Sequence, residues 1–435
     1  MAIRQARQVL AQTNRHVGEY DTPLIDASRH ARLADVLVLL SCGADVNESK
    51  TDGEGVTGLL VASRTGHVEI VWALLAADAA VDLADRCGCT ALFWASRNGH
   101  GDVVPMLLAA CATVDLGDDK GRRPLIAASK NGHIDVVSQL MAAGATVDLG
   151  DHKGRTPLFM ASKHGQADVV TLLLAAGAAV DLADKDGDTP LIVASDHGHV
   201  DVVSQLLAAG AAVDLANRFG ATPLILASDH GHADVVSQLL AAGAAANHVT
   251  GTGGTAMGAA CFQGHLACVQ LLTSFGATRT VAHTPEGLKS TAVQFKTMNH
   301  QETVAAWLVE SRQWSTPLHH LRIVGAARAH ELLRCGADLH AADAPGGPTP
   351  LSLAKALRAA GDPDAAEGSA ASLVLAAAEP WGPRTHALFP AAARGFAVEL
   401  LLLGHQLSRQ PRFAGEEVSL VDVWTELVMP SAIVR

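Results

Sequence analysis

Aromatic residues are scarce in this chain. They make up 4% of its 435 residues, against 49% for hydrophobic residues as a whole, and only one tyrosine is present. Because large rings are few, the core must be built from Ala, Leu and Val, whose small side chains let helices approach closely. This composition favours thin stacked helical layers over one large globular core. The length suits two or three ordinary domains or one long repeat array.

Several targeting and anchoring features are also missing. No stretch of about 18 uninterrupted apolar residues occurs, so the sequence predicts no membrane-spanning helix, and residues 1–20 contain no apolar run of signal-peptide length. The net charge of −12 argues against non-specific binding to nucleic acid. The seven cysteines form no CxxC pair, which favours a reduced, intracellular setting with buried thiols. We expect a cytoplasmic protein, with the nucleus as an alternative.

A repeating pattern dominates what is present. The leucine of a Thr-Pro-Leu triplet recurs at 33-residue steps, as from Leu125 to Leu158 and on to Leu191. Gly-His usually follows the triplet, and then come a Val-Val-x-x-Leu-Leu run and Gly-Ala. After a first step of 35 residues the spacing is constant through the series Leu24, Leu59, Leu92, Leu125, Leu158, Leu191, Leu224 and Met257. A repeat of this length indicates a solenoid.

Each part of the repeat has a physical reason to form a finger, a helix, a turn and a second helix. The Thr can cap a helix through its hydroxyl, and Pro at the first helical position loses no needed donor. Glycines such as Gly132 and Gly177 can end helices in a left-handed conformation. The Asp-x-x-Gly stretch at 184–187 is typical of a tight turn at a finger tip. The second helix carries apolar residues at helical spacing, such as Val202 and Leu206.

This pattern resembles that of the ankyrin-repeat family, whose period and T-P-L-H-x-A signature it nearly matches. The resemblance implies an all-α solenoid of helix–turn–helix units with projecting β-turn fingers. The signature His is replaced by apolar residues such as Phe159, which removes a local hydrogen bond, and Ser162 stands where the family has a second Ala. Asp78 and Cys111 occupy a slot that later repeats fill with Gly, and Pro105 falls inside a second helix, so we expect the second and third repeats to be less stable.

The pattern also divides the chain. Thr316-Pro317-Leu318-His319 resumes the signature after a gap, and Thr349 begins the next triplet 33 residues later. We predict an N-terminal lead-in over 1–20, eight repeats over 21–282, a degenerate repeat over 283–315, partial repeats over 316–360, a linker over 361–380 and a small helical C-terminal segment over 381–435, with helices near 391–406 and 418–428.

The resemblance to this family implies that partners bind a concave face formed by finger tips and exposed inner-helix positions. Those positions are mainly basic in the third to fifth repeats and mildly acidic in the sixth and seventh. The predicted partner-binding residues are Arg86, Arg97, Lys120, Arg122, Lys130, His152, Lys153, Arg155, Lys163, His164, Asp186, Asp188, Asp196, Arg218 and Phe219. We hypothesise that the basic part receives an acidic or phosphorylated segment, for which Arg offers bidentate pairing. The alternative is that these are ordinary solvated positions.

Histidines recur at the repeat period without indicating a metal site. Those after the turn glycine, such as His100 and His133, are predicted to bond neighbouring backbone. A second series, His164, His197 and His230, lies at the edge of the inner helices. A zinc ion needs ligands about 2.1 Å away, and residues one repeat apart are separated by about 10 Å, so no metal is expected.

Three other groups of residues have the residue types of a functional site but not the arrangement that such a site requires. Residues 195–197 spell Ser-Asp-His, but consecutive helical residues point in different directions and cannot form a catalytic triad. The Gly-Thr-rich stretch 251–255 lacks the strand and the lysine of a phosphate loop and is predicted to be a polar finger. Cys87 and Cys89 lie at a finger tip and are predicted to be inert, with a reactive thiol as the alternative.

The sequence therefore predicts a non-catalytic scaffold for protein–protein interaction, without cofactor or metal. We expect it to bind other proteins, neither nucleic acid nor membranes, and to be monomeric. The alternative is a substrate adaptor, for example for a ubiquitin ligase, in which the array captures a client and residues 381–435 recruit a second partner. That segment lacks a clear ligase-recruiting motif.

Overall fold

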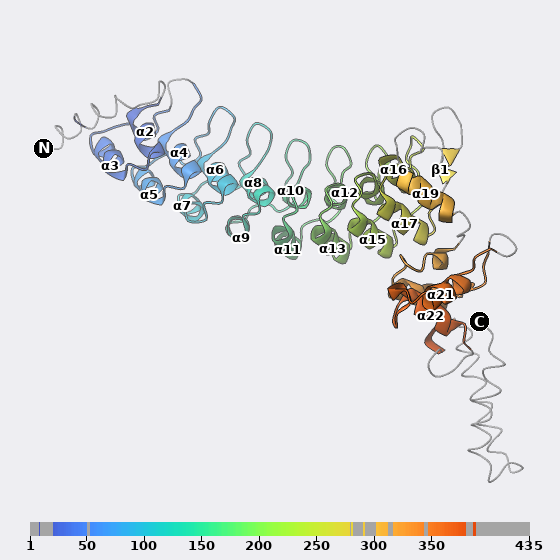
Figure 1. Cartoon of the computed structure of the whole chain (residues 1–435). Helices are drawn as coiled ribbons and strands as arrows, with labels where there is room; N and C mark the ends of the chain where they lie inside the picture. Colours follow the sequence, from blue (N-terminus) through green and yellow to red (C-terminus); the bar gives the residue numbers. More distant parts are fainter. Residues whose placement is uncertain are drawn as a thin grey trace, which may run out of the picture. The chain divides into compact units, whose positions relative to one another are not determined.

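The computed structural model describes most of the chain (Figure 1). The described residues are Gln8, 21–49, 53–278, 280–281, 290–291, 302–311, 316–342, 347–379 and 386–388. Contacts divide the chain into two compact units, Met1–Ala244 and Ala245–Arg435. Among the described residues no helix is long and apolar enough to cross a membrane.

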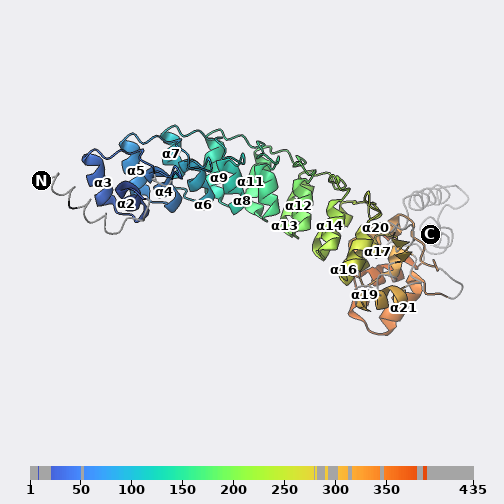
Figure 2. The ribbon, with the colours of Figure 1, turned by 90° about the horizontal axis from the view of Figure 1, so that it is seen from above.

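The first unit is a row of antiparallel helix pairs, each followed by a projecting finger, as expected for an all-α solenoid. Figure 2 shows the pairs following one another in sequence order. The inner helices are α2 Pro23–Arg29, α4 Gly58–Thr65, α6 Ala91–Asn98, α8 Pro124–Asn131, α10 Pro157–Lys163, α12 Pro190–Asp196 and α14 Pro223–Asp229. The outer helices are α3 Leu33–Ser41, α5 Val68–Ala76, α7 Val104–Ala109, α9 Ile134–Ala142, α11 Ala167–Ala175, α13 Val200–Ala208 and α15 Ala233–Ala241.

The inner helices begin at the predicted caps. The Thr156 hydroxyl accepts a hydrogen bond from the backbone N–H of Phe159 at 3.1 Å, and Pro157 follows at the first helical position. The fourth repeat departs from this pattern because Arg123 stands at the cap position and makes no capping bond. Its guanidinium instead donates to the carbonyl oxygens of Gly121 and Gly150 at 2.9 and 2.6 Å, which joins two neighbouring fingers.

The repeat leucines form successive buried layers. Leu125, Leu158 and Leu191 are each at most 1% exposed and lie on adjacent inner helices that pack directly against one another. Complete burial of one such side chain contributes about 1.5–3 kcal/mol. The serine that replaces alanine, such as Ser162, is also fully buried, and its Oγ has no hydrogen-bond partner. The stack therefore holds a series of hydroxyl groups that its packing does not satisfy.

Aspartates near the base of the fingers connect each repeat to the next. Asp82 accepts from the backbone N–H of Thr113 at 3.0 Å, and its carboxylate also accepts from the Thr113 hydroxyl at 2.6 Å. The same backbone bond recurs from Thr146 to Asp115, from Ala179 to Asp148 and from Ala212 to Asp181. Because the same aspartate bond recurs across these interfaces, successive repeats are held in a fixed register.

The second and third repeats carry the expected irregularities. Asp78 and Cys111 have φ values of +61° and +62°, in the left-handed region that their glycine counterparts occupy in later repeats. We expected Pro105 inside a second helix, but it does not lie in a helix interior. Helix α7 begins only at Val104, so Pro105 falls in its first turn, where no intrahelical donor is required. The helix is consequently shorter than the other outer helices.

The second unit contains α16 Ala256–Gln263, α17 Leu266–Ser274, α19 Glu302–Glu310, α20 Ala326–Arg334, α21 Pro350–Ala359 and α22 Ala370–Ala377. It also has the short elements η3 Pro317–His319, η4 Pro363–Ala365 and η5 His386–Leu388, and an antiparallel pair of two-residue strands, β1 Thr280–Val281 and β2 Ser290–Thr291. The signature His is kept here: His319 Nδ1 accepts from the Thr316 backbone N–H at 3.1 Å, and Nε2 donates to the Pro348 carbonyl at 3.0 Å. This is the kind of local hydrogen bond that the apolar replacements in the first unit cannot make.

The expected linker over 361–380 is wrong for most of its length. Ser369 caps α22, and Val374 on that helix is fully buried in a cluster with Leu333 of α20 and Ala354 of α21. The alanine-rich composition resembles a linker, but it packs well because small side chains let α21 and α22 approach closely. The lead-in over 1–20, apart from Gln8, and the helices expected near 391–406 and 418–428 lie outside the described residues.

Candidate functional site

Side-chain hydrogen bonds order the finger turns, from an aspartate in four of them and from Asn217 in the next. Asp118 Oδ1 accepts from the backbone N–H groups of Lys120 and Arg122 at 2.9 and 2.8 Å. Asp151 does the same for Lys153 and Arg155 at 2.9 and 3.1 Å. This side-chain-to-backbone bonding is the usual reason that Asp begins tight turns. The predicted binding residues on the fingers are therefore held on an ordered backbone.

Neighbouring fingers are also joined along the array. In every case a backbone N–H near one finger tip donates to a carbonyl of the preceding finger. The bonds run from Arg86 to Glu54 at 2.8 Å, Asp119 to Cys87 at 3.0 Å, His152 to Lys120 at 2.9 Å, Lys185 to Lys153 at 2.8 Å and Arg218 to Asp186 at 3.0 Å. The fingers form one continuous edge in the first unit.

Four predicted cations on the fingers are neutralised by neighbouring acids. Arg122 Nη2 lies 2.5 Å from Asp118 Oδ2, and Arg155 Nη2 lies 2.5 Å from Asp151 Oδ2. Arg86 pairs with Glu54 at 3.3 Å. Arg218 pairs with Asp186 at 2.6 Å and its guanidinium also lies 4.7 Å from the ring centroid of the exposed Phe219. Charge counting in the sequence overstates the positive charge that these arginines offer to a partner.

A different set of cations is not compensated in this way. Arg64, Arg97, Lys130 and Lys163 each lie in the last turn of an inner helix, one per repeat, and we call them the cationic column. Arg97 and Lys130 are exposed, and the other two are half-buried. None of the four has an ion-pair partner within the described part of the chain. In the next two repeats the same position is held by acids, Asp196 and Asp229.

Side chains of the inter-helix turns bond the backbone of the cationic column, a histidine at three of its members and Gln166 at Lys130. His100 Nε2 donates to the Arg64 carbonyl at 3.0 Å, and His133 Nε2 donates to the Arg97 carbonyl at 3.1 Å. His199 bonds the Lys163 carbonyl in the same way, at 3.1 Å. The prediction that these histidines bond backbone is confirmed, and the carbonyl belongs to the preceding repeat.

The turn glycines are required by this contact, since a Cβ on Gly99 would lie 2.5 Å from His133 Nδ1. Gly99 also has a φ of +77°, which a side chain would make costly. The turn glycine therefore serves the neighbouring repeat as well, because it makes room for the histidine of the next repeat, or for Gln166 in the case of Gly132.

Arg64 and Trp94 were missed by the sequence prediction. The guanidinium groups of Arg64 and Arg97 lie 5.6 and 5.2 Å from the Trp94 ring centroid, within cation–π range. Trp94 Nε1 donates to Asp85 Oδ2 at 3.0 Å, which fixes the indole. The position of Arg64, 33 residues before Arg97, was a usable signal. The role of Trp94 depends on side-chain packing across two repeats, which no pattern in the sequence reveals.

The electrostatics differ between the two halves of the inner face. Burial lowers the pKa of His164, and the positive charges of Lys130 and Lys163 lower it further, although its hydrogen bond to the Met160 carbonyl opposes this. Burial raises the pKa of Asp188. The neighbouring acids, including Asp196, raise it further against the opposing hydrogen bond from Asn217. The predicted polarity, basic in the middle repeats and acidic afterwards, is consistent with these shifts.

The histidine series, the Ser-Asp-His stretch and the Gly-Thr-rich stretch form no catalytic or metal-binding arrangement among the described residues. His164 and His197 each donate from Nδ1 to a carbonyl one turn back in their own helix, at 3.0 Å. No group of three His, Cys, Asp or Glu side chains that could hold a metal occurs in the described ranges. Ser195 is fully buried, so its hydroxyl is inaccessible to a substrate. In the stretch 251–255 a finger turn forms, with Gly254 N–H donating to Thr250 Oγ1 at 2.8 Å.

The cysteines correct one expectation. All seven are free, but only three are buried, so the expected burial of thiols fails for Cys42, Cys87, Cys111 and Cys335. Burial and the charges of Asp85 and Asp118 raise the pKa of Cys89 to about 12, although Arg122 opposes the shift. The Cys89 thiol is therefore protonated at neutral pH and a poor nucleophile.

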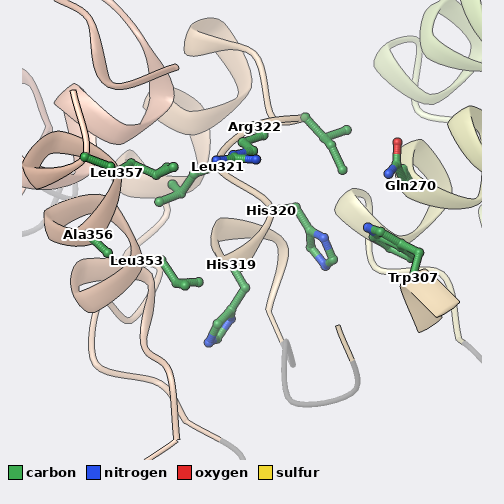
Figure 3. A pocket seen from close by; sticks show the side chains of 11 residues that line it. Gln270, Trp307, His319, His320, Leu321, Arg322, Leu353, Ala356 and Leu357 are labelled. Carbon is green, nitrogen blue, oxygen red and sulfur yellow. The ribbon is translucent and has the colours of Figure 1, made fainter. Parts of the chain in front are cut away.

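The second unit contains a hollow of about 620 Å³ between α17, α19 and α21 (Figure 3). Its walls include Trp307, His320 and Leu353, with the Trp307 and His320 ring centroids 5.7 Å apart. The one arginine at its edge, Arg322, is bound to Asp362 at 2.5 Å. The hollow is largely apolar and offers no uncompensated charge, so the inner face of the first unit is the stronger candidate.

Stacked helix pairs with joined fingers define a repeat solenoid, a class of protein that presents an extended surface to other macromolecules. The sequence matches the family profile described as Ankyrin repeats (3 copies) over residues 24–118, 107–184, 125–218, 168–250 and 199–282. These matches together span more than half of the chain, which therefore belongs to the ankyrin-repeat family. Proteins of this family generally bind other proteins.

Comparison with other proteins adds little beyond the family. No curated protein matches the sequence. Among solved structures, the human ASB11 ankyrin repeat domain is 30% identical over 52% of this chain and 99% of that chain, with a TM-score of 0.47.

Proposed function

We propose that this chain is a non-catalytic scaffold for protein–protein interaction, and that the inner face of its second to fifth repeats binds an acidic segment of a partner, phosphorylated side chains included. The supporting observation is the cationic column, four cations at one helical position without an ion-pair partner in the described chain. Family membership supports the coarser statement that the partner is a protein.

The column is a better basis for this function than the finger arginines. A carboxylate from a partner would have to compete with Asp118 for Arg122 and with Asp151 for Arg155. An exposed cation without an acid partner can instead form a new pair, at about 0.2–1 kcal/mol each. Several such pairs in a row give moderate affinity that falls as salt is raised, because the charges are exposed to screening.

Charge reversal in the column tests the proposal. The double variant Lys130→Glu/Lys163→Glu is compared with Lys355→Glu/Arg358→Glu, which makes the same change in net charge at two cations of α21 in the second unit. Binding of a fluorescein-labelled, glutamate-rich peptide is measured by anisotropy at low and moderate salt. We expect the column variant to bind about tenfold more weakly or worse, and the control to bind like the wild type.

Equal binding by the wild type and the column variant would refute the role of the column. Circular dichroism of both variants checks that the helices are retained, and none of the four substituted side chains is buried. Reversal of Arg122 and Arg155 would be a poorer test, because it would also remove the ion pairs that stabilise the fingers.

The adaptor alternative requires a second partner class recruited through residues 381–435, of which only 386–388 are described. A variant truncated after Leu388 separates the two functions. A scaffold keeps every protein that is captured through the first unit, whereas an adaptor loses a whole class of captured proteins.

A further inference from the structure

The cationic column has a regular spacing that limits what can bind to it. Its members are successive repeats of one position, and the helices that carry them, α4, α6, α8 and α10, pack directly against one another. Packed helices lie about 8–10 Å apart. The four residues therefore follow one another at a step of about 8–10 Å, on backbone bonded by His100, His133, Gln166 and His199 of the following repeats.

Only some backbone conformations place side chains on one face at that step. In a β-strand, side chains on one face are two residues apart, or about 6.6–6.8 Å, and the next is about 13 Å away. In a polyproline II helix every third side chain points the same way, and three residues advance the chain by about 9.3 Å. The polyproline II spacing agrees with the column and the strand spacing does not.

We propose that the cationic column binds a partner segment in the polyproline II conformation that carries an acidic side chain at every third position. This rests on the proposed function, and it names the conformation and spacing of the ligand. Each acidic side chain meets one of Arg64, Arg97, Lys130 and Lys163, and the residues between them face the inner helices or solvent.

Trp94 supports this choice of ligand. It is half-buried on the inner face, its indole is fixed by the bond to Asp85, and both arginines of the column lie over its ring. Polyproline II segments dock on aromatic side chains, because proline rings pack against flat apolar surfaces and the conformation is preformed. A proline between two acidic residues of the ligand can contact the Trp94 indole edge, while the carboxylates reach the flanking guanidinium groups.

An α-helix with acids seven residues apart is the competing ligand, since seven residues advance it by about 10.5 Å. A helix is about 10–12 Å in diameter with its side chains, so it contacts neighbouring surface as well as one column. The column is one residue wide in each repeat, and the finger arginines beside it, Arg122 and Arg155, are already paired. These observations favour the narrower segment.

The test uses three labelled peptides of equal charge and the full-length protein. One has glutamate at every third position and proline elsewhere. The second has the same composition, with glutamates at alternating intervals of two and four residues, so that half of them leave the common face. The third is an alanine-rich helix with glutamate at every seventh position. Anisotropy at moderate salt is measured for the wild type, Lys130→Glu and Trp94→Leu.

We expect the proline peptide with regular spacing to bind about tenfold more tightly than the proline peptide with alternating spacing. The alternating peptide can form only two of the four ion pairs with the column. Lys130→Glu should remove most of this preference, and Trp94→Leu should weaken the regular peptide more than the helical one. Equal affinity of the two proline peptides overturns the proposed spacing but leaves the acidic-segment function in place. Tighter binding of the helical peptide overturns the proposed conformation, and binding of no peptide overturns the proposed function as well.

Discussion

Replacing Cys111 by glycine should stabilise the protein. Cys111 is exposed and has a φ of +62°, whereas the same slot in later repeats holds Gly144, Gly177, Gly210 and Gly243 with φ between +83° and +90°. Left-handed backbone costs an L-residue about 1–2 kcal/mol. Glycine offsets about 0.4–1 kcal/mol of this gain, because it gives the unfolded chain greater conformational freedom. The expected net gain is about 0.5–1 kcal/mol.

The reciprocal substitution provides a matched control. Nothing lies within 4 Å of a Cβ built on Gly177, so Gly177→Cys introduces backbone strain without a steric clash and should lose about as much as Cys111→Gly gains. Both are measured by urea unfolding followed by circular dichroism, with the midpoint compared at unchanged slope. Because neighbouring repeats stabilise one another, amide exchange in α7 and α9 should slow in the Cys111→Gly variant.

The reasoning would be refuted if Cys111→Gly lowered the midpoint while Gly177→Cys left it unchanged. That result would mean that the backbone at these turns relaxes in solution, or that the Cys111 side chain makes a stabilising contact.

Three further predictions concern the contacts that hold the stack. Ser162→Ala should raise the free energy of unfolding by about 1 kcal/mol, because it removes a buried hydroxyl without a partner; a lower urea midpoint would contradict this. His133→Ala should lower stability by about 1 kcal/mol through loss of its bond to the Arg97 carbonyl, seen as faster amide exchange in α8. Burial alone would raise the pKa of Asp151, but hydrogen bonds from the Arg155 side chain and two backbone N–H groups outweigh it, so the pKa is lowered. The stabilisation by Asp151 is therefore present above its unfolded pKa near 3.8 and is lost as pH falls through the lower folded pKa. The difference in free energy of unfolding between the wild type and Asp151→Asn should accordingly shrink between neutral pH and pH of about 3.

The sequence predicted the helix pairs well because their signals are local. Thr156 and Pro157 begin α10 through groups that lie within the same turn, and the repeat leucines mark the buried side of every inner helix. The linker at 361–380 was wrong because alanine and glycine are common both in linkers and in closely packed helices. Whether α22 packs depends on the residues it meets, such as Leu333, which lie elsewhere in the chain.

The candidate site was only partly predictable. Arg97, Lys130 and Lys163 could be found because one position recurs in each repeat. Arg122 looked equally available in the sequence, and its neutralisation by Asp118 depends on how the finger turn brings the two side chains to 2.5 Å.

By itself the sequence determined the period, the caps and turns, the family and the polarity of charge along the array, because each of these is set by residues within one 33-residue unit. Tertiary structure decided which cations remain unpaired, that two arginines share the Trp94 ring and that the turn histidines bond the preceding repeat. Those features arise only when neighbouring units stack, since they depend on distances between residues about one repeat apart, and hydrogen bonds and ion pairs form over a few ångströms.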